Sequence, residues 1–271
     1  MSAPEKVTVA EVEGGHWYDV HGNLVQTVPS ADGKKQVKCT LRHAKVHDLA
    51  RGCTSIIGSC DKPALTRWKM EQVALAACTL LRIDGETPES YQLRLLDEAQ
   101  TIGRTSAAEG NRVHAQIQRH YQLAPVEPAY QEHVDGAVRE LDELGCDEWR
   151  VEVPCVSRFG YGTMADLVGY RNSRPVMLVD TKTKDGSLAE LMAMRLYDEH
   201  FMQLAATIEA LGLDPRTMGT AILLVSRTHP GSCRLVPVDL EQIQRGWSLF
   251  RPLLAYTHAK DSHKPTWADK D

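Results

Sequence analysis

Two aspartates and a lysine accompany two apolar runs in the stretch from 161 to 184, YGTMADLVGYRNSRPVMLVDTKTK. Asp166 lies in the first run, and Asp180 and Lys182 end the second. A strand sends alternate side chains to one face, so Asp180 and Lys182 are expected to point together, about 7 Å apart along the backbone, while Thr181 points away. If the runs pair as a hairpin through GYRNSRP, both carboxylates lie at one sheet end, which predicts a site for a hard divalent cation.

Such a site suits the hydrolysis of phosphodiester bonds. Magnesium keeps several waters and accepts phosphate oxygens, so it needs few protein ligands. The cation offsets the charge of the scissile phosphate and lowers the pKa of a bound water. The ammonium of Lys182 would hold the attacking water or the phosphate oxygens, and the carboxylates keep it charged. The alternative is that the D-x-K pattern is only the solvated rim of a strand, because short motifs often occur by chance.

Interleaved helical and strand patterns predict an α/β fold with a central mixed sheet flanked by helices. The strand candidates EWRVEVPCV, GTMADLVGYR, PVMLVDTK and GTAILLVSR are bounded by turn signals. A helix is expected from Ser187 towards Gly212, and a final one from about Leu240 to Ala255. These elements would place the acidic pair at the edge of a buried sheet.

Helices also fill the region before the strands. Pro63 suits the first turn of one helix, PESYQLRLLDEAQTI predicts a second, and a capping box of Ser106 and Glu109 predicts the start of a third. On that third helix Gly110 and His114 share one face. Glycine costs about 1 kcal/mol of helix stability against alanine, so close packing is expected at Gly110. A single histidine on a helix, such as His114, is more often a packed or capping residue than a metal ligand.

Composition limits the classes of function. The 271 residues are enough for a sizeable core, and 31 basic against 36 acidic residues give a net charge of -5, so any nucleic-acid site must be a local basic groove. Seven cysteines with no C-x-x-C pair indicate reduced thiols.

The opening MSAPEKVTVAEVEGG lacks the pattern of a leader, and no stretch approaches the ~18 apolar residues of a membrane span. We expect a cytoplasmic protein without a membrane partner.

Two basic groups are candidates for contact with phosphates. One lies in the segment 31–51, where a solvated loop and surface helix explain the charges equally well. The other surrounds Trp68, which either stacks on a base or, as is more usual at helical spacing, packs in the core. The members are Lys34, Lys35, Lys38 and Arg42, then Lys62, Arg67, Trp68 and Lys69.

The order of these motifs resembles the RecB-like branch of the PD-(D/E)XK nuclease superfamily, closest to its phage and mitochondrial exonucleases. The leading segments HWYDVHGNLV and CTSIIGSCDKPALTRWKMEQVALAA are also similar to that branch, so the resemblance spans most of residues 16 to 226. It implies a restriction-endonuclease-like core. The matching motifs are Gly110-x-x-x-His114, VEVP, GTMAD ending at Asp166, Asp180-Thr181-Lys182, and Gln203 on the following helix.

The resemblance implies a role for each matching residue. The metal ligands would be His114, Asp166, Asp180 and the backbone carbonyl of Thr181. Lys182 would be the catalytic lysine, acting with the two aspartates and with Gln203, which orients the lysine or the DNA. Glu152 in VEVP would contact a metal ligand without binding the metal itself, or it would simply be a glutamate at the rim of a strand. The sequence departs from the family at Thr207, where a tyrosine is usual.

The resemblance also implies cofactors, partners and a division of the chain. Mg²⁺ or Mn²⁺ is expected, with the imidazole favouring manganese. An iron-sulfur cluster is not expected, because only Cys233 follows the nuclease motifs. The partner is DNA, with room for a recombination or single-strand-binding protein, in the host cytoplasm if the protein is phage-encoded. The expected regions are an N-terminal hairpin and helical DNA-guiding region (1–104), a nuclease core (105–257) and a frayed polar tail (258–271).

Three functions follow from this pattern. The first is a metal-dependent DNA exonuclease that acts at single-stranded or duplex ends in phage-type recombination, replication or repair. The second is an endonuclease on the same core, because the metal site does not distinguish an end from an interior bond. The third is a catalytically silent nucleic-acid-binding or inhibitory protein, which Thr207 and the acidic charge favour. Retention of Asp166, Asp180 and Lys182 argues against the third, because unpaired carboxylates repel each other without a cation.

Overall fold

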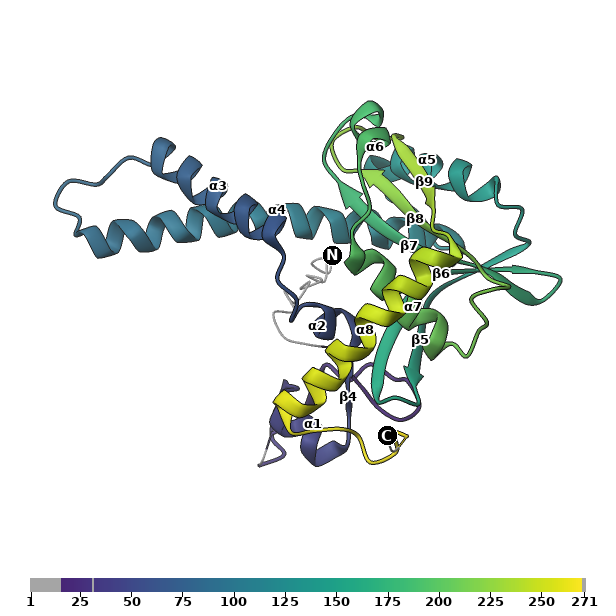
Figure 1. Ribbon diagram of the computed structural model, residues 1–271. Coiled ribbons are helices and arrows are strands. Elements are labelled where there is room, and N and C mark those ends of the chain that lie inside the picture. Colours follow the sequence, from purple (N-terminus) through teal and green to yellow (C-terminus); the bar gives the residue numbers. More distant parts are fainter. Residues whose placement is uncertain (1–15, 31, 270–271) are drawn as a thin grey trace, which may run out of the picture.

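The computed structural model describes residues 16–30 and 32–269 and has a mixed α/β fold (Figure 1). The opening segment 1–15, to which the expectation about a leader applies, lies outside the described residues, as does the end of the tail at 270–271. Among the helices of the described part, none is both long enough and apolar enough to cross a membrane.

A central mixed sheet of seven strands confirms the predicted α/β architecture. Its order is β1-β4-β6-β7-β8-β9, with β5 also paired to β6. The pairs β4–β6 and β7–β8 are parallel and the others are antiparallel. The strands are β1 (Trp17–Tyr18), β4 (Ala50–Gly52), β5 (Glu148–Ser157), β6 (Tyr161–Arg171), β7 (Arg174–Lys184), β8 (Gly219–Ser226) and β9 (Cys233–Pro237).

The hairpin expected between the two acidic strands is present. Asn172 and Ser173 form its turn with φ values of 50° and 60°, a left-handed conformation that asparagine tolerates and that matches the twist of paired strands. The ladder between β6 and β7 runs up to the pair Leu167 and Val179. The next register positions along the two strands belong to Asp166 and Asp180, so both carboxylates stand where the ladder ends.

Helices cover both faces of the sheet (Figure 1). On one face, α4 (Pro88–Tyr121) and α5 (Gln131–Asp142) pack apolar side chains against β6, β7 and β8. On the other face, α7 (Asp198–Ala210) and α8 (Leu240–Asp261) form a second core with the same strands. The sheet is therefore held rigidly from both sides, which fixes the positions of groups at its edge.

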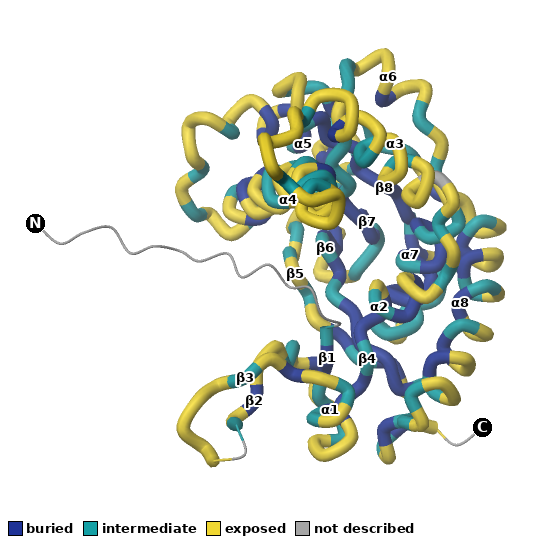
Figure 2. Tube along the Cα trace, turned by 90° about the vertical axis from the view of Figure 1, so that its left-hand side faces the viewer, coloured by how far each residue is buried: buried dark blue, intermediate teal, exposed yellow. Residues whose placement is uncertain are grey.

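A helical arm projects from this body (Figure 1). It consists of α3 (Pro63–Thr79), which begins at the predicted Pro63, and the first half of α4. The Tyr91 hydroxyl donates to the carbonyl oxygen of Leu80 over 2.8 Å, which joins the two helices near the tip. Figure 2 shows that the arm is largely exposed, and Met70, at 66% exposed, is one of several apolar side chains that face solvent there.

The remaining elements surround the sheet. The strands β2 and β3 form a separate two-stranded sheet beside β1 and α1, on the exposed lower part of the molecule in Figure 2. The 3-10 helix at Pro128–Tyr130 leads into α5. The other bounds are β2 (Thr27–Pro29), β3 (Gln36–Lys38), α1 (Leu41–His47), α2 (Cys53–Ile57) and α6 (Leu188–Ala193).

Two expectations about helices are wrong. Ser106 and Glu109 do not start a helix, because α4 runs without a break from Pro88 to Tyr121 and passes through the boundary expected at 104/105. Gly103 lies within this helix and does not interrupt it. Its open side faces the ring of Trp68 in the arm. The helix expected from Ser187 to Gly212 is two helices, α6 and α7, although the capping box of Ser187 and Glu190 is present as predicted.

The polar tail is not frayed over its described part. The helix α8 continues to Asp261, six residues beyond its expected end at Ala255. Beyond it, Thr266 donates through its backbone N–H to Asp48 Oδ1 over 2.8 Å, and Trp267 Nε1 donates to the Asp48 carbonyl over 3.0 Å. These contacts anchor the tail on α1, an outcome that a polar composition does not reveal.

Candidate active site

The D-x-K residues of β7 meet Gln203 of α7. Lys182 Nζ lies 2.8 Å from Asp180 Oδ2, which confirms that the two side chains share a face. Gln203 joins both: its Nε2 donates to Asp180 Oδ1 over 2.7 Å, and its Oε1 accepts from Lys182 Nζ over 3.0 Å. Asp180 is only 5% exposed. The lysine is thus fixed at the sheet end by one helix and its own strand.

Asp166 of β6 meets α4 on the other side of this group. Its Oδ2 is 3.0 Å from His114 Nε2 and accepts the backbone N–H of Thr181 over 2.9 Å. Thr181 therefore turns its side chain away from the lysine and its backbone towards the acid. Each aspartate has its own set of partners, one supplied by α4 and one by α7.

Gly110 sets how closely α4 approaches β7. A Cβ on this residue would collide with Oγ1 of Thr183 and lie 3.7 Å from Arg227 Nη1. The close packing predicted from a glycine one turn before His114 is thereby confirmed. Because the helix can approach the strand, the imidazole of His114 reaches the end of β6.

The charges of the site depend on one another. Burial raises the pKa of Asp180 to about 6, with Asp166 adding to the rise and Lys182 opposing it. Burial alone would lower the pKa of Lys182, but the two aspartates outweigh it and raise the pKa, so the lysine stays a cation. Burial likewise opposes protonation of His114, yet its hydrogen bond to Asp166 raises the pKa of the ring.

The donors fit a divalent cation in kind. They are an imidazole, two carboxylates and a nearby backbone carbonyl, which suit magnesium or manganese. Asp180 Oδ2 is buried and receives no directed hydrogen bond from the described residues, although Lys182 Nζ is close, so one carboxylate oxygen is left for another positive partner. Within residues 16–30 and 32–269, no three His, Cys, Asp or Glu side chains are grouped so as to hold an ion.

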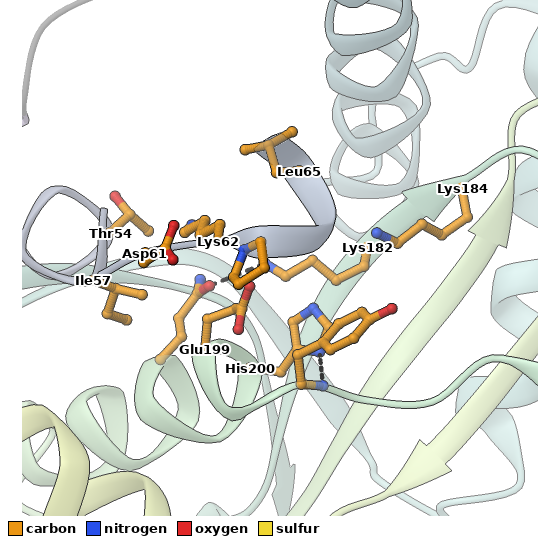
Figure 3. Close-up of a pocket in the computed structure, with 12 residues that line it drawn as sticks. Thr54, Ile57, Asp61, Lys62, Leu65, Lys182, Lys184, Glu199 and His200 are labelled. Atoms are coloured by element: carbon orange, nitrogen blue, oxygen red, sulfur yellow. Dashed lines mark hydrogen bonds between the residues drawn. The ribbon is translucent and has the colours of Figure 1, made fainter. Parts of the chain in front are cut away.

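Two cavities adjoin the site, and Lys182 and Gln203 line both. The smaller, of about 330 Å³, contains His114 and Asp166. The larger, of about 680 Å³, lies between the α2–α3 junction, β7 and the start of α7. Figure 3 shows Lys62, Lys182 and Lys184 around the larger cavity, together with His200. The larger cavity therefore opens onto Lys182, and its lining contains these three lysines against two acids, Asp61 and Glu199.

Of the predicted DNA-binding residues, Lys62 is the one that lines this cavity. Arg67 forms an exposed ion pair with Glu71, and Trp68 is half-buried against Gly103 within the arm, outside the buried core that the core alternative expected. The others line neither cavity and stand exposed on the β2–β3 hairpin, α1 or α3: Lys34, Lys35, Lys38, Arg42 and Lys69. The structure thus keeps the two basic groups apart, and only the second group reaches the larger cavity, through Lys62.

Sequence reasoning missed several residues of the site. Gln118 contacts both His114 and Glu152, and its position four residues after His114 was a usable signal. Lys184 was equally accessible, because it follows Lys182 by two residues on the same strand. His200 offered a similar signal, because it lies one turn before Gln203 on α7, and both line the larger cavity.

No protein-family model matches the chain, and no curated protein matches it. Among solved structures, the chain is similar to one described as "Crystal Structure of LHK-Exo in complex with dAMP". The likeness covers 70% of this chain and 87% of that chain, with 13% identity and a TM-score of 0.34. This is a weak likeness, and it leaves the function of the present chain open.

Proposed function

We propose that this protein is a metal-dependent DNA exonuclease with a restriction-endonuclease-like core. The substrate would be single-stranded or duplex DNA ends, in phage-type recombination, replication or repair. The observation that carries the proposal is the fixed cation of Lys182, 2.8 Å from Asp180 and 3.0 Å from Gln203, beside the His114–Asp166 pair. A partly buried ammonium next to two acids suits a reaction in which negative charge develops on a phosphate.

The ligands of the cation would be His114, Asp166, Asp180 and the carbonyl of Thr181. When bound, the cation supplies the charge that offsets the scissile phosphate and lowers the pKa of a water. Lys182, which the two acids keep charged against the effect of burial and which Asp180 and Gln203 hold in place, would hold the attacking water or a phosphate oxygen. Gln203 holds the side chains of Lys182 and Asp180 in fixed positions, so the site needs little reorganisation when the substrate arrives.

The larger cavity supports a polyanionic substrate. Lys62 and Lys184 add two cations to Lys182 around a space of about 680 Å³, so its lysines outnumber its two acids, Asp61 and Glu199. Burial, together with Lys182 and Arg227, lowers the pKa of Lys184, so a phosphate close by would relieve the crowding of like charges. A local groove of this kind is what a chain of net charge -5 needs to bind DNA.

The test is digestion of end-labelled linear DNA and of circular single-stranded DNA with Mg²⁺, Mn²⁺ or chelator. We expect linear DNA to be degraded only with metal and circular DNA to stay intact, whereas opened circles would indicate the endonuclease alternative. Asp180→Ala and Lys182→Ala should lower the cleavage rate by about a thousandfold while DNA binding persists. Undiminished cleavage by either purified variant, folded by circular dichroism, would remove this mechanism.

A further inference from the structure

The ring of His114 has a second partner besides Asp166. Gln118 lies one turn further along α4, and its Nε2 is 2.7 Å from His114 Nδ1. The same Nε2 donates to Glu152 Oε1 over 2.8 Å. Gln118 is 9% exposed, so its amide has little access to water as an alternative partner. Glu152, Gln118, His114 and Asp166 thus form one continuous chain of hydrogen bonds.

Counting hydrogens along this chain gives a single assignment. A carboxylate only accepts, so Glu152 requires the NH₂ group of Gln118 rather than its oxygen. The second N–H of that group then points at His114 Nδ1, which must offer its lone pair. The hydrogen of the neutral ring is therefore on Nε2, where Asp166 Oδ2 accepts it at 3.0 Å.

The backbone of Glu152 supports a special role for this residue. Its φ is 48°, in the middle of β5, between the regular pairs Val151 with Leu167 and Val153 with Ala165. A left-handed conformation costs a non-glycine residue about 1–3 kcal/mol, and such strain tends to occur at functional sites. Here it falls on the residue whose side chain orients the Gln118 amide.

We propose that Gln118, oriented by Glu152, is the positioning residue that sets the tautomer of His114. This inference deepens the proposed nuclease site. A ring nitrogen that carries a hydrogen cannot be a metal ligand, so His114 can serve a cation through Nε2 only when the hydrogen is on Nδ1 and the Gln118 oxygen faces it. Glu152 opposes that orientation of the amide. The pair therefore controls how readily the imidazole binds a divalent cation.

The first test reads the tautomer directly by nitrogen NMR of the metal-free protein, above the pH at which the ring titrates. The His114 signals are assigned by their loss in His114→Asn. We expect a hydrogen on Nε2 and none on Nδ1 in the natural protein. In Gln118→Glu the new carboxylate accepts from Nδ1, so the hydrogen should move there. The control is Gln122→Glu, which adds the same charge one turn further along and should leave the tautomer unchanged.

The second test is calorimetric titration of the same proteins with Mn²⁺. Gln118→Glu and Glu152→Gln should bind Mn²⁺ about tenfold more tightly, because both favour a hydrogen on Nδ1, whereas Gln118→Leu and Gln122→Glu should not. A hydrogen that stays on Nε2 in Gln118→Glu, or an unchanged affinity, overturns the proposal. Neither measurement needs cleavage, so a protein that fails to cut DNA yet shows both shifts would refute the nuclease function alone.

Discussion

Gln203 Nε2 donates a 2.7 Å hydrogen bond to Asp180 Oδ1, so a residue of α7 holds the aspartate of a motif on β7. Its Oε1 accepts from Lys182 at 3.0 Å. We therefore expect Gln203→Leu to lower kcat by about 10- to 100-fold with little change in KM, since the lysine loses its fixed position but the cavity remains. Steady-state cleavage at saturating metal measures this, with exposed Gln244→Leu on α8 as the control. A normal kcat would show that the lysine needs no such support.

Two glycines of α4 should respond in opposite ways to alanine. Gly110→Ala puts a Cβ against Thr183 Oγ1, and we expect a loss of about 1–3 kcal/mol in the free energy of unfolding. Gly103→Ala meets Trp68 at 3.5 Å, an ordinary contact, so the gain in helix propensity should stabilise the protein by about 0.5–1 kcal/mol. Urea denaturation measures both values.

A compensating change tests the cause of the Gly110 effect. In the double variant Gly110→Ala/Thr183→Ala the colliding hydroxyl is gone, so most of the lost stability should return. If the double variant is as unstable as Gly110→Ala alone, contact with Thr183 is not what excludes a side chain at position 110.

The local signals predicted what depends on neighbouring residues. The strand period placed Asp180 and Lys182 on one face, and the turn signals between the apolar runs predicted the hairpin that aligns Asp166 with Asp180. Gly110 indicated a close approach because glycine is costly within a helix. In each case the signal lies within a few neighbouring residues, so a single sequence contains it.

What escaped prediction depends on contacts between distant segments. Ser106 has a capping pattern, yet α4 continues through it, and its carbonyl accepts Arg227 Nη1 at 2.8 Å. The tail was expected to fray, but its partner Asp48 lies more than two hundred residues earlier. The split between α6 and α7 likewise depends on tertiary packing, which propensity does not encode.

His200 should make the protein less stable in mild acid. Burial, with Lys182 and Lys184, lowers the pKa of its ring to about 4, and its Nδ1 accepts the backbone N–H of Tyr197 over 3.1 Å. As pH falls from about 6.5 to about 4, the unfolded chain takes up a proton that the folded state refuses. The free energy of unfolding should therefore fall by up to about 3 kcal/mol over this range from this residue.

His200→Gln provides the comparison. Glutamine is a normal partner at the third position of a helix and can accept the same backbone hydrogen bond without titrating. The variant should match the natural protein near neutral pH and lose less stability on acidification, as measured by urea unfolding at several pH values with chelator present. Parallel pH curves for the two proteins would show that His200 is not kept neutral by the fold.

The lysines that line the larger cavity should contribute more to DNA binding than the lysines of the β2–β3 hairpin. Lys62 and Lys184 line the larger cavity that opens onto Lys182, so a strand that reaches the site through this cavity passes them. In the cleavage-deficient Asp180→Ala background, removing either by alanine should weaken binding of single-stranded DNA and reduce the slope of log K against log salt by about 0.7, because one fewer counterion is released.

The exposed hairpin pair Lys34 and Lys35 lines neither cavity and provides a matched comparison of charge. Fluorescence anisotropy over a salt series measures all the variants. A loss of slope in Lys34→Ala/Lys35→Ala as well would extend the DNA path from the cavity to the β2–β3 hairpin. An unchanged slope in both Lys62→Ala and Lys184→Ala would contradict passage of the strand through the cavity, because a phosphate bound there cannot avoid these two cations.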